Sequence, residues 1–211
     1  MLLFDWIQRK RHAKGYGIHS PFAFWLVRTA LYSRHTFYAF GDIEKHLRRN
    51  KIKPEVITEL NHLSFRLVHY LKARHILEIH SSSGVNTLFV TSPHSEIRCV
   101  CIEPDATKIA DARALHHNNN ISYHSTMQEI AGQKFDAIFI YVENEEIPPI
   151  DTLLHFSHPN TFWVIAPIRG KMTKQFWRNI VKDNRARVVF DMTHVGVVFW
   201  NPTFLKKKYK V

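Results

Sequence analysis

The chain has 211 residues, of which 45% are hydrophobic and 22% are charged, and it carries 29 Lys and Arg against 18 Asp and Glu, a formal charge of +11. This composition is typical of a globular protein and excludes a disordered chain. No run of about 18 uncharged apolar residues occurs, and the N-terminus lacks the long apolar stretch of a signal peptide, so we expect a cytoplasmic protein with no membrane partner.

The first third of the chain is predicted to be helical. Ser20 precedes Pro21 and an apolar run to residue 32, which is typical of an N-cap followed by proline in the first turn. Further helices are predicted near residues 42–49 and over 54–71. The second of these has one apolar stripe at helical spacing, formed by Val56, Leu60, Leu63, Leu67, Val68 and Leu71. We therefore expect residues 1–72 to form a helical extension.

From residue 73 onward the pattern alternates between strands and helices. Seven short apolar strands are predicted, at residues 75–79, 97–102, 121–124, 135–141, 161–166, 187–192 and 196–200. Helices are predicted from residue 85, over 106–116, from Asp151 to residue 156, and over 173–183. Such alternation predicts a mostly parallel sheet covered by helices, whereas the last two strands follow each other as a hairpin. Residues 73–211 are thus expected to form an α/β domain with one antiparallel strand.

Cys99 and Cys101 are the two cysteines, and they are two residues apart within a predicted strand. Both thiols should lie on one face of the sheet, where we expect them to be buried and reduced. Because no second cysteine pair exists, the sequence lacks a zinc site of the paired-cysteine type.

Basic residues gather in residues 9–14, 48–53 and 206–210. Clusters of this kind attract phosphate-rich partners, but they also serve as solvated surface, and no nucleic-acid motif accompanies them. The basic clusters alone therefore do not decide between a nucleic-acid partner and a solvated surface.

A ligand site is expected where the first strand of the α/β part ends, since open parallel sheets bind ligands at the carboxyl ends of their strands. There the chain has Glu78, then a turn from His80 to Gly84 that includes Ser81 and Ser82. Glu103 follows the next strand, and a carboxylate in that position can accept both hydroxyl hydrogens of a ribose. The alternative is that Glu103 merely flanks the next helix.

These residues resemble the class I S-adenosylmethionine-dependent methyltransferases, in particular a bacterial branch similar to small O-methyltransferases. The similar segments are residues 14–24, with Gly17-Ile18-His19-Ser20-Pro21-Phe22, and residues 76–88, 136–140 and 196–199. The resemblance implies a Rossmann-like methyltransferase fold with a mostly parallel seven-stranded sheet, a terminal antiparallel strand and N-terminal helices. It also implies S-adenosylmethionine as cofactor, bound by Glu78, His80, Ser81, Ser82, Gly84 and Glu103.

The chain departs from that family at several positions. His80 and Ser82 stand where the cofactor loop of the family has glycines. Tyr141, Ala166 and Pro167 stand where metal-dependent members carry acidic residues, so we expect no metal.

Three functions are compatible with this pattern. The first is methyl transfer to an unknown small-molecule acceptor without metal, with His80 or Glu143 as a candidate base. The second is a catalytically degenerate member that keeps the fold as a binding or scaffold module. The third is a basic, RNA-binding methyltransferase. The residues assign no catalytic group, acceptor or oligomeric state.

Overall fold

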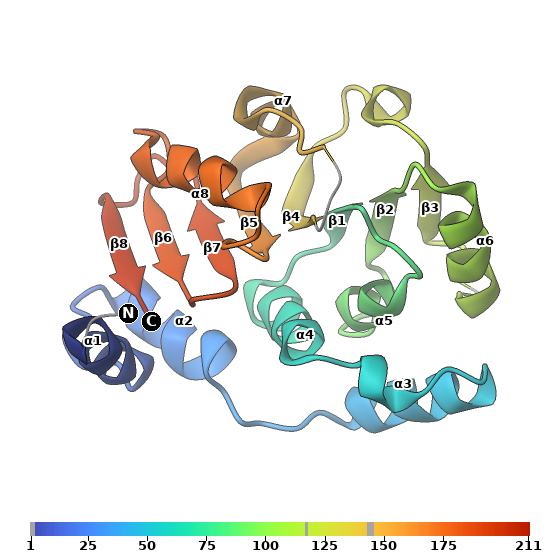
Figure 1. Ribbon diagram of the computed structural model, residues 1–211, viewed down its shortest axis with the longest axis horizontal. Helices are drawn as coiled ribbons and strands as arrows, with labels where there is room; N and C mark the ends of the chain where they lie inside the picture. The colour runs from blue at the N-terminus through green and yellow to red at the C-terminus, as the bar shows by residue number, and fades with distance from the viewer. Residues whose placement is uncertain (1–2, 117, 143–145) are drawn as a thin grey trace. The chain divides into compact units, whose positions relative to one another are not determined.

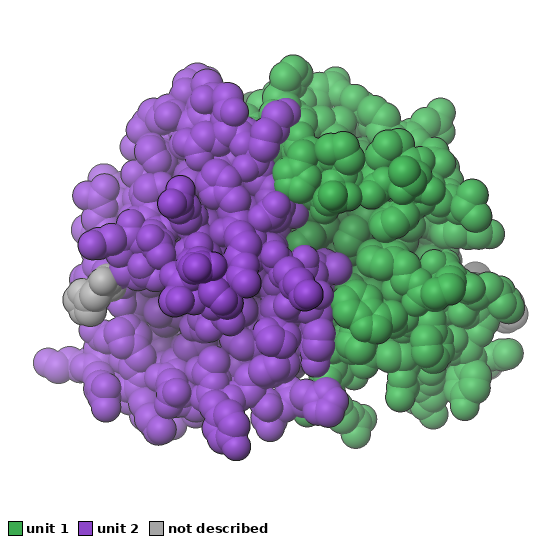
Figure 2. All heavy atoms as spheres, turned by 180° about the vertical axis from the view of Figure 1, so that it is seen from behind, with its two compact units in different colours: residues 1–34, 142–211 green, residues 35–141 purple. Residues whose placement is uncertain are grey.

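The computed structural model describes residues 3–116, 118–142 and 146–211. The chain divides into two compact units, unit 1 with residues 1–34 and 142–211, and unit 2 with residues 35–141 (Figure 2). The division at residue 72 stays a prediction. Within the described residues, no helix combines the length and the apolar character needed to cross a membrane.

The core of unit 2 is a parallel sheet of four strands in the order β3-β2-β1-β4 (Figure 1). Their bounds are His75–Ile79 for β1, Arg98–Ile102 for β2, Ile121–His124 for β3 and Phe135–Tyr141 for β4. All four strands were predicted. The register places Glu78 of β1 beside Cys101 of β2 and Phe139 of β4, so that a carboxyl group lies in the middle of an apolar sheet.

The described residues of unit 2 also form four α-helices, and the predicted ranges 42–49, 54–71 and 106–116 differ from three of them. The helices are α3 Tyr38–Arg49, α4 Glu59–Leu71, α5 Val85–Thr91 and α6 Ala106–Leu115. The prediction of one continuous helix over 54–71 is wrong at its start. Thr58 and Asn61 form a capping box, so that α4 begins only at Glu59. Val56 lies instead on a 3-10 turn and is exposed.

An apolar cluster joins three of these helices. Phe40, Ile43 and Leu47 of α3 pack with Phe65 of α4 and Phe89 of α5. The cluster is rich in aromatic rings, and the centroids of Phe40 and Phe65 are 5.0 Å apart in an edge-on contact. This packing fixes α5, and with it the loop between β1 and α5.

Unit 1 contains four strands in the order β5-β7-β6-β8. Their bounds are Ser157–Ala166 for β5, Val188–Asp191 for β6, Gly196–Phe199 for β7 and Lys207–Lys210 for β8. β7 runs antiparallel to β5 and to β6, which confirms the predicted hairpin. β8 is an eighth strand that we did not predict: its lysines suggested a solvated tail, but Tyr209 is buried and stacks on Phe190 with 5.2 Å between centroids.

The helices of unit 1 are α1 Leu3–Ala13, α2 Pro21–Leu26, α7 Ile150–His155 and α8 Thr173–Lys182. Ser20 is the N-cap of α2, as predicted, and its hydroxyl accepts a hydrogen bond from the Ala23 N–H. A π-helix over 27–31 continues α2. The N-cap of α7 is Pro149 rather than Asp151.

Candidate cofactor site

The loop from β1 to α5 has an unusual backbone. His80, Ser82 and Gly84 have φ angles of +59°, +51° and +78°. A left-handed conformation costs a residue with a side chain about 1–2 kcal/mol, whereas glycine adopts it freely. The loop therefore has a left-handed backbone at His80 and Ser82, the positions at which the methyltransferase family that the sequence resembles has glycines. Only the third left-handed residue, Gly84, is itself a glycine. Strain of this kind is often retained at functional sites.

Contacts on both sides hold this loop in place. The His80 N–H donates to the carbonyl of Ile102 over 2.8 Å, and the Ser82 N–H donates to Oε2 of Glu103 over 2.9 Å. At the far end, Nε2 of His116 lies 2.9 Å from the Gly84 carbonyl oxygen. The loop is thus fastened to β2 and to the end of α6.

Glu103 lies just after β2 and is only 2% exposed. Its second oxygen, Oε1, accepts from the Asp105 N–H over 3.1 Å. Asp105 in turn is the N-cap of α6, accepting from the Thr107 N–H over 2.8 Å. One carboxylate therefore links the loop to the start of α6. Because a carboxylate offers about four lone-pair positions, it retains acceptor capacity beyond these two bonds.

Glu78 is fully buried beneath the loop. Oε1 accepts from Nδ2 of Asn86 over 2.8 Å, and Oε2 accepts from the hydroxyl of Thr87 over 2.6 Å. Burial raises the pKa of the Glu78 carboxyl, an effect that these hydrogen bonds partly oppose. Glu78 thus anchors the first turn of α5.

The polar network around Glu78 extends to β4 and α4. Nδ2 of Asn86 also donates to the hydroxyl oxygen of Tyr141 over 2.6 Å, and Asn61 donates to Oδ1 of Asn86 over 3.0 Å. Burial raises the pKa of the Tyr141 hydroxyl. The sequence drew attention to Tyr141 only because it stands where metal-dependent methyltransferases have an acidic residue, and Asn86 was not predicted as a site residue. The position of Asn86 two residues after Gly84, in the first turn of α5, is the signal that could have found it.

Cys99 and Cys101 lie on one face of β2, as predicted, and both are free and buried. Their sulfurs are 3.9 Å apart, and each lies within 4 Å of Oε2 of Glu78. The three groups are close enough to share a metal ion. Burial, however, raises the pKa of the Cys99 thiol well above its ordinary value, which opposes the thiolate that a metal requires.

The hydroxyl of Ser81 is a buried polar group of the loop without a hydrogen-bond partner among the described residues. Ser81 as a whole is 5% exposed. A buried hydroxyl without a partner is costly, so the loop has an unused polar group suited to a ligand.

All six residues predicted to bind the cofactor lie close together. The side chain of Glu78 belongs to the polar network beneath the loop, and residues 80–84 form the loop itself. The carboxylate of Glu103 accepts a hydrogen bond from the loop. His80 is half-buried, with its Nδ1 atom shielded from solvent. Glu143, the other candidate base, lies outside the described residues. The binding roles of these residues stay predictions.

Neither a family model nor a curated protein matches this sequence. Solved structures do match. A methyltransferase from Geobacter sulfurreducens aligns over 80% of this chain and 92% of its own, with a TM-score of 0.59 and 15% identity. The O-methyltransferase TomG from Streptomyces achromogenes, in complex with SAM, aligns over 79% and 91%, with a TM-score of 0.58 and 15% identity.

A third structure, the O-methyltransferase from Bacillus cereus in complex with SAH, aligns over 79% of this chain and 92% of its own, with a TM-score of 0.59 and 16% identity. The chain has the fold of these methyltransferases. This confirms the predicted Rossmann-like methyltransferase fold and its resemblance to O-methyltransferases. At such low identity the likeness concerns the methyltransferase fold, not the reaction.

Proposed function

We propose that this chain binds S-adenosylmethionine at the β1–α5 loop and transfers its methyl group without a metal to an acceptor that the sequence does not specify. The observation that supports the proposal is the left-handed backbone at residues 80, 82 and 84. A loop that keeps this conformation without the glycines that make it easy is better explained by a retained ligand than by folding alone. The neighbours TomG and the Bacillus cereus enzyme were solved with SAM and SAH.

The residues at the loop fit such a ligand. Ser81 offers a buried hydroxyl that has no hydrogen-bond partner in the described part of the chain, and Glu103 offers carboxylate lone pairs for ribose hydroxyls. When bound, S-adenosylmethionine supplies a methyl group activated by the sulfonium. The role of this chain is then to hold the cofactor and acceptor in line, which is the main requirement of a methyl transfer. Because Glu103 is almost fully covered, ribose binding requires the loop to shift.

Isothermal titration with S-adenosylmethionine and S-adenosylhomocysteine tests the proposal. We expect both to bind, and Ser81→Ala to weaken binding about ten-fold, the effect of losing one hydrogen bond of about 1.4 kcal/mol. Ser95→Ala is the matched control, because Ser95 is exposed and lies away from the loop. The absence of heat with both ligands would contradict the proposal.

The alternative is a degenerate methyltransferase fold that acts as a scaffold. It is favoured by the carboxylate of Glu103, whose two oxygens already accept hydrogen bonds from Ser82 and Asp105 within the protein. A scaffold would bind neither ligand, and its thermal unfolding midpoint would not rise when either is added. The same titration therefore separates the two functions.

A further inference from the structure

The positive charge of this chain is distributed very unevenly. Unit 1 contains 17 Lys and Arg against 7 Asp and Glu, a formal charge of +10, whereas unit 2 contains 12 against 11, a charge of +1. Charge asymmetry of this kind is typical of a part that meets a polyanion. Unit 2, which carries the candidate cofactor loop, is nearly neutral.

Four of the basic residues of unit 1 form a stripe along α8 and the residues just before it. Lys174, Arg178 and Lys182 recur every fourth residue, Lys171 precedes the helix, and all four are exposed. A spacing of four residues corresponds to a rise of about 6 Å along one side of a helix. We refer to these four residues as the α8 stripe. None of them belongs to the basic clusters that stand out in the sequence.

The helix that carries the α8 stripe supplies no acidic side chain of its own to neutralise it. α8 contains neither Asp nor Glu, and within the described part of the chain the four residues form no ion pair. Like charges four residues apart on a helix are destabilising by a few tenths of a kcal/mol each. The stripe therefore has an electrostatic cost that nothing in its own helix offsets.

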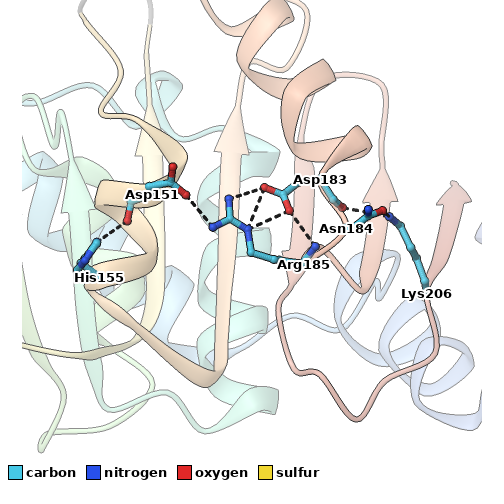
Figure 3. A network of polar contacts seen from close by, with 6 residues as sticks. All are labelled: Asp151, His155, Asp183, Asn184, Arg185 and Lys206. Carbon is cyan, nitrogen blue, oxygen red and sulfur yellow. Dashed lines mark hydrogen bonds and ion pairs between the residues drawn. The ribbon is translucent and has the colours of Figure 1, made fainter.

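Asp183, the acid nearest to α8 in sequence, is held by another cation, Arg185, which also contacts Asp151 (Figure 3). Arg185 contacts Asp183 and Asp151, each over 2.7 Å, and Lys206 donates to the Asp183 carbonyl oxygen and to Asn184. Arg185 lowers the pKa of the Asp183 carboxyl through its hydrogen bonds. These contacts keep Asp183 beside Arg185, at the end of α8.

The apolar face of α8 is committed to its own unit. Trp177 and Ile180 are buried, and a Cβ atom at Gly196 of β7 would lie 2.3 Å from the Trp177 ring. Helices that lie on membranes need a free apolar face to insert. α8 has no such free face, so its basic side faces solvent as a polar surface with the amides of Gln175 and Asn179 between the charges.

From this geometry we infer that the α8 stripe binds the phosphodiester backbone of a nucleic-acid strand. Lysine and arginine in a row contact successive phosphates, and the release of counterions drives the association. Amide side chains between them offer hydrogen bonds to sugars and bases. The inference does not rest on cofactor binding, because every residue that it uses lies in unit 1.

Fluorescence anisotropy of the full chain with a labelled single-stranded RNA, and with DNA of the same sequence, tests the inference. The variant K174Q/R178Q removes two charges from the stripe. We expect it to weaken binding about ten-fold at low salt, and to make the slope of log K against log salt shallower by about 1.4, since each phosphate contact on a single strand contributes about 0.7.

The matched control is R48Q/R49Q, which removes two exposed arginines from α3 in unit 2. It should leave the affinity and the salt slope unchanged, and both variants should keep the thermal unfolding midpoint of the wild type. Failure of the wild type to bind either oligonucleotide would overturn the inference. So would equal weakening by both variants, or binding only to vesicles of anionic lipid in a parallel sedimentation assay. Titration with S-adenosylhomocysteine in parallel keeps this outcome distinct from that of the proposed function.

Discussion

The backbone N–H of Ser82 lies 2.9 Å from Oε2 of Glu103, so the residue expected to hold a ribose also holds the loop. The two roles are compatible because a carboxylate can accept more than one hydrogen bond per oxygen. They also make the loop and the ligand dependent on the same side chain. Changes at Glu103 should therefore affect stability and binding together.

Replacing Glu103 by Ala should show both effects. The Ser82 and Asp105 N–H groups would lose a charged acceptor, and we expect the free energy of unfolding to fall by about 1–3 kcal/mol. S-adenosylhomocysteine binding should weaken by about 1–3 kcal/mol as well. Urea unfolding and isothermal titration measure the two quantities. Glu96→Ala, at an exposed residue, is the control; unchanged affinity in Glu103→Ala would mean that the ribose site is elsewhere.

The conformation of the loop gives a second prediction. A Cβ atom at Gly84 would lie 2.6 Å from Nε2 of His116, and Gly84 has a φ of +78°. We expect Gly84→Ala to destabilise the protein by about 2–4 kcal/mol, from backbone strain and overpacking combined. Gly132 has a φ of +84° with open space around it, so Gly132→Ala should cost only the strain, about 1–2 kcal/mol. Equal losses in the two variants, measured by urea unfolding, would contradict the role of His116.

How far the sequence predicts this fold depends on the side chains that each element buries. Strands such as β1 and β4 bury most of their residues and contain runs of apolar side chains, and their ranges were predicted correctly. β8 was missed because three of its four residues are exposed lysines, and only the ring of Tyr209 enters the core. The break between Val56 and α4 was missed because a capping box outweighs the apolar spacing that continues across it.

The candidate site was predicted in part. The resemblance located the loop and the two carboxyl residues, but sequence spacing says nothing of a left-handed backbone at His80 and Ser82. Nor does it reveal that Asn86 bridges Glu78 and Tyr141, since those contacts join residues from three elements. The α8 stripe was overlooked for a related reason: its charges are separated along the chain and meet only on the surface of a helix.

His80 provides a third prediction, which concerns the cofactor directly. In His80→Gly the left-handed backbone becomes unstrained, and this gain of about 1 kcal/mol is offset by the greater flexibility of the unfolded chain, so stability should change little. Removing the imidazole allows the backbone to approach a ligand more closely. We therefore expect tighter binding of S-adenosylhomocysteine by isothermal titration. Weaker binding would instead indicate that the imidazole contacts the ligand.

The buried carboxyl of Glu78 gives a prediction for pH. Burial raises its pKa in the folded protein above the ordinary value of 4.5, so the folded state keeps this proton to a higher pH than the unfolded chain does. Stability from this group is therefore greatest below about pH 4.5 and falls as the pH rises through the raised pKa. Glu78→Gln removes the titrating group while keeping an oxygen acceptor for Asn86.

The measurement is urea unfolding of the wild type and Glu78→Gln from below pH 4.5 to neutral pH. The difference in unfolding free energy should shift in favour of the variant as the pH rises, because only the wild type loses stability through this group. Glu96→Gln, at an exposed carboxyl, should run parallel to the wild type. If the Glu78→Gln curve also ran parallel to the wild type over the whole range, the carboxyl of Glu78 would titrate alike in the folded and unfolded chains, contrary to its burial beneath the loop.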